Sequence, residues 1–75
     1  MPEVPLLKAQ EVVNVFMRLV WNVARSKGSH IIMVKEGRFA TLSIPNHREV
    51  ARGTLRSLIR KSDLTVEEFL EALGR

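Results

Sequence analysis

The chain contains no cysteine, and its longest uninterrupted apolar run is the segment from Ile31 to Val34. Without cysteine there is no disulfide framework, no thiolate zinc site and no cysteine nucleophile. A membrane-spanning helix needs roughly 20 apolar residues, and no basic segment leads into an apolar one as in a secretion signal. These absences predict a soluble, cytoplasmic protein with no membrane partner.

The chain is also short, at 75 residues. Compact domains commonly have about 100–150 residues, so residues 1–75 are expected to form a single domain with a thin core. A domain of this size buries only about 60% of its unfolded surface, and any functional site should therefore lie at or near the surface. Hydrophobic residues make up 45% of the chain and charged residues 27%, which argues against a disordered tail.

The formal net charge of +4 is distributed unevenly. Residues 1–61 contain 11 lysines and arginines against 4 carboxylates, whereas residues 62–75 contain one cation and 4 carboxylates. A basic body with an acidic end favours a polyanionic partner, because neutralised phosphates release counterions. An ordinary solvated surface is the alternative at this net charge.

Three segments have the apolar spacing of amphipathic helices. The first runs from about residue 7 to residue 20, and the second from Thr54, its candidate N-cap, to about residue 61. The third is marked most clearly, because Thr65 and Glu68 match a capping box and Gly74 follows at the C-cap position.

Between the first two helices the pattern changes to β-branched and apolar residues with two candidate reversals, at residues 27–29 and 36–37. The expected strands cover roughly residues 21–25, 30–35 and 38–44. A helix, three antiparallel strands and two further helices predict a two-layer α+β domain.

A two-residue hairpin loop at Glu36-Gly37 would pair His30 with Ser43. One face of the sheet is then uniformly apolar and expected to lie under the helices, with Ile31, Met33, Ala40, Leu42 and Ile44. The other face is half polar and half apolar, with His30, Ile32, Val34, Phe39, Thr41 and Ser43. An exposed apolar strip beside a histidine indicates a contact surface for a partner. A longer loop that shifts the register by one residue would reverse the two faces.

One local cluster has side chains that could take part in a reaction: Arg25-Ser26-Lys27-Gly28-Ser29-His30. Two cations, a glycine, a hydroxyl and an imidazole lie within six residues at a strand-to-strand turn. Arg25, Lys27 and the turn amides can hold a phosphodiester while His30 addresses a hydroxyl proton. A lone strand histidine that only makes structural hydrogen bonds is the alternative.

Other enzyme signatures are missing from the sequence. His30 and His47 lack the spacing of a metal site, and neither a Walker loop nor a GxGxxG motif is present. We therefore expect neither a metal nor a cofactor.

Three separated motifs, at residues 21–30, 44–47 and 52–60, closely resemble the HicA family of toxin mRNA interferases. The family pattern joins a helix ending in Gly-Phe to an Arg, a Gly-Ser-His turn, a Pro-x-His strand end and a Gly-Thr-Leu helix start. The resemblance runs from about residue 8 to residue 73. This chain departs from the pattern at Val20-Trp21, which replaces Gly-Phe, and at Ile31, where a second histidine often follows the motif histidine.

The resemblance implies a double-stranded-RNA-binding-domain-like fold, α-β-β-β-α with a short C-terminal helix. It also implies a metal-independent endoribonuclease that degrades mRNA and is inhibited by a HicB-type antitoxin. By motif position the catalytic residue is His30, Gly28 and Ser29 shape its turn, and His47 is expected to have a structural role.

We further expect Arg25 and Lys27 to stabilise charge at the phosphate. Arg56 and Arg60, with Lys61, are candidates to contact the RNA backbone, and a solvated helix face is the alternative. Gly53 argues against one helix that continues back through Arg48 and Arg52. Two other functions stay open. One is an RNA-binding module without catalysis. The other is a helix-turn-helix-like DNA-binding domain, although the three predicted strands between the helices argue against it.

Overall fold

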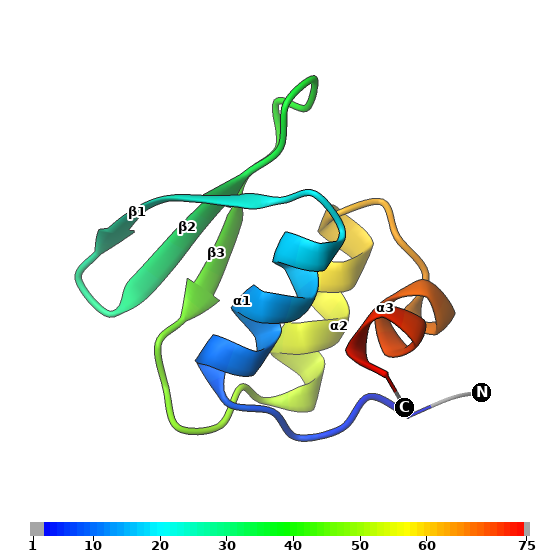
Figure 1. Ribbon diagram of the computed structural model, residues 1–75. Helices are drawn as coiled ribbons and strands as arrows, with labels where there is room; N and C mark the ends of the chain where they lie inside the picture. Colours follow the sequence, from blue (N-terminus) through cyan, green and yellow to red (C-terminus); the bar gives the residue numbers. More distant parts are fainter. Residues whose placement is uncertain (1–2, 75) are drawn as a thin grey trace.

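The computed structural model describes residues 3–74 and arranges them in two layers (Figure 1). One layer is an antiparallel sheet in the order β1-β2-β3, and the helices lie on one face of it. The elements are α1 (Ala9–Arg18), β1 (Asn22–Lys27), β2 (His30–Val34), β3 (Leu42–Pro45), α2 (Arg52–Lys61) and α3 (Val66–Leu73). This confirms the α+β, double-stranded-RNA-binding-domain-like fold. Within residues 3–74, every helix is too short or too polar to cross a membrane.

The first helix ends in a turn that ordinarily uses glycine. The Val20 N–H donates to the Met17 carbonyl at 3.1 Å, and the Trp21 N–H donates to the Phe16 carbonyl at 2.9 Å. These two bonds define the Schellman motif, and its usual apolar contact is present as an edge-on packing of Trp21 on Phe16, with ring centroids 6.5 Å apart. Val20 has a φ of 70°, a left-handed conformation that is unfavourable for a β-branched residue. The junction thus keeps the geometry of a glycine turn with a valine in it.

Replacing Val20 by glycine is expected to stabilise the protein by about 0.5–1 kcal/mol. Glycine relieves the left-handed strain, and the valine side chain is 67% exposed, so little buried area is lost. The greater chain entropy of glycine in the unfolded state offsets part of the gain. Urea denaturation measures the change, with Val20→Ala, which keeps the Cβ atom, as the control that should gain less. A lower urea midpoint for Val20→Gly than for the parent chain would contradict this explanation.

The reversal predicted at Glu36-Gly37 is present, but it is not a two-residue hairpin loop. Gly37 has a φ of 84°, and the Arg38 N–H donates to the Lys35 carbonyl at 3.1 Å. A positive φ at the second central residue alone is the signature of a type II turn, whose twist splays the flanking strands. The strands accordingly separate into a loop of residues 35–41, which stands out from the end of the sheet in Figure 1.

The register of β2 against β3 therefore differs by two residues from the predicted one, and His30 pairs with Pro45 instead of Ser43. Because side chains alternate with a period of two, this shift keeps each strand residue on its predicted face. The alternative with reversed faces is wrong. Residues 38–41, predicted for the third strand, lie in the loop, so Phe39, Ala40 and Thr41 belong to neither face of the sheet. The face under the helices carries the buried side chains of Met33, Leu42 and Ile44.

The second helix begins three residues before its predicted start. Ala51 is the N-cap, so Thr54 is not a cap and Gly53 lies inside the helix. The Arg52 Nε donates to the Val4 carbonyl at 3.0 Å, which fastens the first turn to the N-terminal segment. This tertiary contact offsets the roughly 1 kcal/mol that an interior glycine costs a helix.

The third helix has the predicted ends. The Thr65 N–H donates to the Glu68 carboxylate at 2.9 Å, and the Thr65 Oγ1 accepts the Glu68 N–H at 3.1 Å. Gly74 closes the helix with a φ of 93°. The capping box and the C-cap glycine are therefore confirmed.

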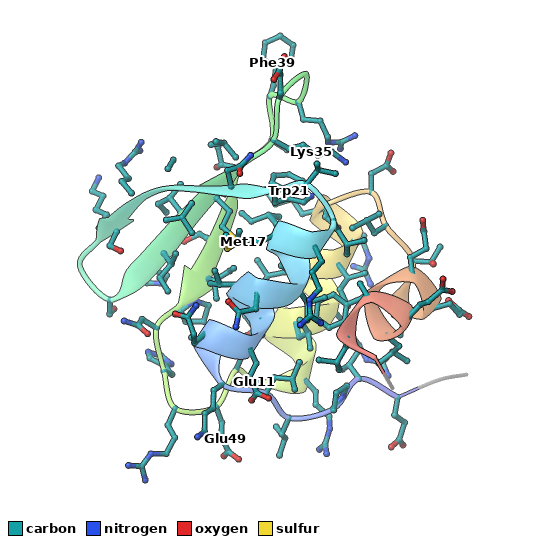
Figure 2. All side chains as sticks on the ribbon, viewed as in Figure 1. Glu11, Met17, Trp21, Lys35, Phe39 and Glu49 are labelled. Atoms are coloured by element: carbon teal, nitrogen blue, oxygen red, sulfur yellow. The ribbon has the colours of Figure 1, made fainter. Side chains whose placement is uncertain are left out.

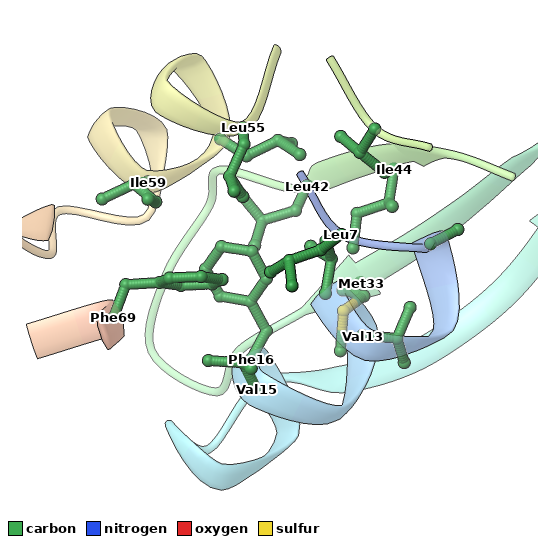
Figure 3. Close-up of a cluster of buried hydrophobic side chains, with 14 of the residues drawn as sticks. Leu7, Val13, Val15, Phe16, Met33, Leu42, Ile44, Leu55, Ile59 and Phe69 are labelled. Atoms are coloured by element: carbon green, nitrogen blue, oxygen red, sulfur yellow. The ribbon is translucent and has the colours of Figure 1, made fainter. Parts of the chain in front are cut away.

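All helices and the inner face of the sheet meet in one core (Figure 3). The rings of Phe16 and Phe69 lie at its centre, with centroids 5.3 Å apart. The helix α1 begins at Ala9, so Leu7, predicted for its start, lies before it and forms a β-bridge with Val50. Leu7 and Val4, which the sequence pattern did not place, add two buried side chains to the core. The core occupies the inner face of the sheet, so the exposed chemistry gathers on the outer face and the hairpin.

Candidate functional site at the β1–β2 hairpin

The reversal predicted at residues 27–29 is a two-residue turn between β1 and β2. Lys27 pairs with His30, and Gly28 and Ser29 form the tip. Gly28 has a φ of 59°, which the first central position of a type II′ turn requires and which glycine adopts without steric cost. Directly opposed residues of an antiparallel pair point to the same face, with Cβ atoms about 5 Å apart. The turn thus places Lys27 and His30 side by side.

Strand alternation places Arg25 on the same face as Lys27, because the two residues are two apart along β1. Arg25 pairs with Ile32, and the β-bulge of this strand lies at Ala24, on the far side of Arg25 from the turn. Because Ile32 is two residues from His30 along β2, the side chains of Arg25 and His30 project from one face of the sheet. The bulge changes the register only for the residues of β1 that precede Arg25. The sequence carries no turn residue or apolar pattern that marks this bulge.

This face of the sheet is open, because the helices cover the other one (Figure 1). All residues of β1 are exposed, and so are Ser29 and His30. Among residues 3–74, the side chains of Arg25, Lys27 and His30 take part in no hydrogen bond or ion pair. His30 is therefore not the internally bonded strand histidine of the structural alternative, and three polar groups face solvent together.

The end of β3 lies against the same turn. His30 pairs with Pro45, and the Asn46 N–H donates to the Ser29 carbonyl at 2.7 Å. The next residue, His47, is exposed, and its carbonyl accepts the first backbone N–H of α1 at 3.3 Å. The Gly-Ser-His turn of residues 28–30 and the Pro-x-His strand end of residues 45–47, which 14 residues separate in the sequence, thus lie next to each other.

Arg56 and Arg60 are exposed but lie in the other layer, on α2. This helix packs beside β3, so the structure does not place these arginines on the face that carries His30. At about 100° per residue, Arg56 and Arg60 share a stripe with Arg52, contrary to the expected boundary at Gly53. Lys61 points in another direction around the helix and does not belong to that stripe.

Within residues 3–74, no other cluster has comparable chemistry. No three His, Asp or Glu side chains of this segment lie close enough together to hold a metal ion. Glu67 and Glu68 occupy the first turn of α3, where carboxylates stabilise the helix dipole. Two open depressions lie between α1 and α3, away from the hairpin.

A family model described as the HicA toxin of bacterial toxin-antitoxin systems matches residues 9–64. The matched segment contains α1, the whole sheet and α2, including the hairpin. No curated protein and no solved structure matches the chain significantly. The family match covers most of the chain and agrees with the resemblance of the three motifs. The chain therefore belongs to the HicA family of toxins from bacterial toxin–antitoxin systems.

Proposed function

We propose that this toxin is an endoribonuclease that cleaves mRNA at the β1–β2 hairpin without a metal ion. The observation that carries the proposal is the exposed imidazole of His30 on one open face with Lys27 and Arg25. Membership of the HicA family supports it, because HicA toxins are generally ribonucleases. Two cations beside an imidazole match the needs of a reaction at a phosphodiester.

RNA supplies its own nucleophile, the 2′-hydroxyl group. In the proposed reaction His30 accepts the proton of this hydroxyl while its oxygen attacks the adjacent phosphorus. The bond from phosphorus to the 5′-oxygen then breaks, which leaves a 2′,3′-cyclic phosphate and a 5′-hydroxyl. Water or a second protonic group gives a proton to the departing oxygen. Imidazole suits the role of base because histidine changes its charge near neutral pH.

The cations act on the pentacoordinate phosphorane, whose negative charge exceeds that of the ground state. Lys27 and Arg25 stabilise this charge, and the turn at Gly28 and Ser29 lets the backbone approach the phosphate closely. General base catalysis typically contributes about 10²–10⁴-fold. A single imidazole with electrostatic assistance gives a modest enzyme, which is sufficient for a protein that arrests growth by degrading mRNA.

The RNA flanking the cleaved bond extends over the edge of the sheet in this proposal. Arg56 and Arg60 lie beyond β3 on α2, and they bind the backbone of RNA that passes around this edge. Contacts of this kind contribute affinity and salt dependence without sequence information.

The toxin–antitoxin family implies an antitoxin partner. We propose a HicB-type protein that covers the hairpin in the cytoplasm, with an acidic surface opposite Arg25 and Lys27. Complementary charge masks a basic site effectively because it speeds association and excludes neutral competitors.

The decisive experiment is analysis of the RNA product. The purified toxin, freed of antitoxin, is incubated with single-stranded mRNA fragments in the presence of EDTA, and the fragment ends are identified by mass spectrometry. We expect 2′,3′-cyclic phosphate ends. The matched control is the same RNA with a 2′-deoxy nucleotide at the mapped cleavage position, which lacks the nucleophile and should stay intact there.

The same experiment tests the competing function. Intact RNA with a shifted electrophoretic mobility would identify an RNA-binding module without catalysis and would refute the endoribonuclease. Cleavage at the 2′-deoxy position would refute the transesterification mechanism while leaving a nuclease.

A further inference from the structure

Phe39 is the most exposed large apolar side chain in the structure, with a relative exposure of 106%. It lies at the tip of the loop of residues 35–41, beyond the end of the sheet (Figure 2). The other phenylalanines, Phe16 and Phe69, and the only tryptophan are fully buried. A ring placed outside the fold contributes nothing to the core and is free to contact a molecule that the protein binds.

The loop that presents this ring is held at two points. Its type II turn is closed by the bond from the Arg38 N–H to the Lys35 carbonyl. The Arg38 guanidinium lies 3.4 Å from the Asp63 carboxylate, which belongs to the connection between α2 and α3. Each contact is weak by itself, but both fix the residue immediately before Phe39. The ring is therefore carried on a tethered loop and directed away from the helices.

The open face of the sheet connects Phe39 to the hairpin. The strand β2 runs from His30 at one end to Val34 at the other, a distance of about 13 Å at the usual rise of a strand. Between these ends the face offers Arg25 and the half-buried Ile32. Lys35 then stands at the base of the loop, as Figure 2 shows. One continuous surface thus leads from an imidazole through cations and apolar side chains to an exposed aromatic ring.

This composition fits single-stranded nucleic acid. Residues 22–41 contain four cations and one carboxylate, which suits a polyanionic backbone. Proteins that bind unpaired RNA combine such a basic surface with aromatic rings on which bases stack. A protein partner would favour a wider apolar patch around the ring, whereas Val34, at 36% exposure, is the nearest exposed apolar residue in the sequence.

We propose that Phe39 is a substrate-binding residue that stacks on an unpaired base of the RNA, a few nucleotides from the bond at His30. This inference rests on the proposed ribonuclease function and adds a substrate class to it. The RNA must be single-stranded at the base that reaches the loop, because a paired and stacked base offers no free ring face. The toxin should therefore select unpaired segments of mRNA.

The test measures binding, so that it does not depend on cleavage. The probe is a 2′-O-methylated single-stranded oligonucleotide, which lacks a free 2′-hydroxyl, with 2-aminopurine at one position at a time. We expect Phe39→Ala to weaken binding about 5- to 160-fold, the range found for loss of one stacked base. It should also abolish the fluorescence quenching at one or two probe positions. Phe39→Trp should retain both properties. Leu6→Ala, which removes an exposed side chain from the N-terminal segment, is the matched control and should not change binding.

Each outcome decides the proposal. Equal affinities for Phe39→Ala and the parent chain would overturn it, and so would equal loss in Phe39→Ala and Leu6→Ala. A variant that binds RNA normally but loses its antitoxin would assign the ring to the protein partner instead. If the parent chain binds no RNA, both this inference and the proposed function fail. If RNA binding depends on Phe39 but no cleavage occurs, only the nuclease assignment fails.

Discussion

Replacing His30 by glutamine is expected to lower RNA cleavage by about a hundredfold or more, while RNA affinity stays within a few-fold. Glutamine retains a polar side chain at this position but cannot accept the proton of a 2′-hydroxyl at neutral pH. The imidazole is exposed and bonded to nothing in residues 3–74, so the substitution removes a reactive group without leaving a buried polar partner. Single-turnover cleavage rates and dissociation constants for uncleavable RNA measure the two quantities separately.

The structure offers a matched control for this variant in His47. This second histidine is also exposed and follows the strand end that contacts the hairpin turn, so His47→Gln removes an imidazole from the same region. We expect its cleavage rate to stay close to that of the parent chain, because its expected role is carried by the backbone. Comparable cleavage by His30→Gln and the parent chain would refute the catalytic assignment, and equal losses in both variants would indicate that two imidazoles share the chemistry.

The sequence was sufficient for the elements whose ends are marked by local chemistry. Thr65 and Glu68 satisfy backbone groups within one turn, so their pattern determines the start of α3 without any tertiary information. The start of α2 could not be found in this way. Its first turn is fastened by the bond from Arg52 to the Val4 carbonyl, a partner that is 48 residues away and has no local signature.

The sheet likewise had one feature that was predicted correctly from the local sequence, the faces of the strands, and one that was not, the register. Alternation of apolar residues correctly assigned both faces of the sheet, because a period of two is a local property of the backbone. The pairing itself depended on the turn type at Glu36-Gly37. Glycine at the second central position fits a type II turn, whereas the two-residue hairpin turns need a positive φ at the first position, which glutamate disfavours, so this signal was present but was missed. The resulting loop carries Phe39 away from the sheet, and no sequence pattern indicated that this residue stands alone in solvent.

The candidate site was identified by residue type more than by position. Lys27, Gly28 and His30 were grouped because they lie within six residues at a predicted reversal. The two-residue turn that opposes Lys27 to His30 is a finding of the structure. Arg25 lies on the same face because it is two residues from Lys27 along the strand, and the bulge that the sequence did not indicate lies beyond it, at Ala24. The arginines of α2 were grouped by spacing alone, and their separation from the open face follows from how α2 packs on β3.

Phe69→Ala is expected to destabilise the protein by about 3–5 kcal/mol, as loss of a fully buried phenylalanine side chain usually does. Phe69 is the one fully buried residue within α3, and its ring packs on Phe16 in the centre of the core (Figure 3). A chain of this length has a total stability of about 4–11 kcal/mol, so the variant should lose a large part of it. We expect the thermal midpoint, followed by circular dichroism, to fall by more than about 12 °C. Glu67→Ala, an exposed change on the same helix, is the control.

This variant also tests where the folded unit ends. The family match stops at residue 64, before α3 begins, yet Phe69 from α3 and Val4 from the opposite end of the chain are buried in the same core. A small shift for Phe69→Ala, similar to that of Glu67→Ala, would mean that α3 is an accessory helix on a core completed by residues 9–64. The expected large shift requires the opposite: α3 completes the core, because residues 9–64 alone retain the contact of Phe16 with Trp21 but lose its contact with Phe69.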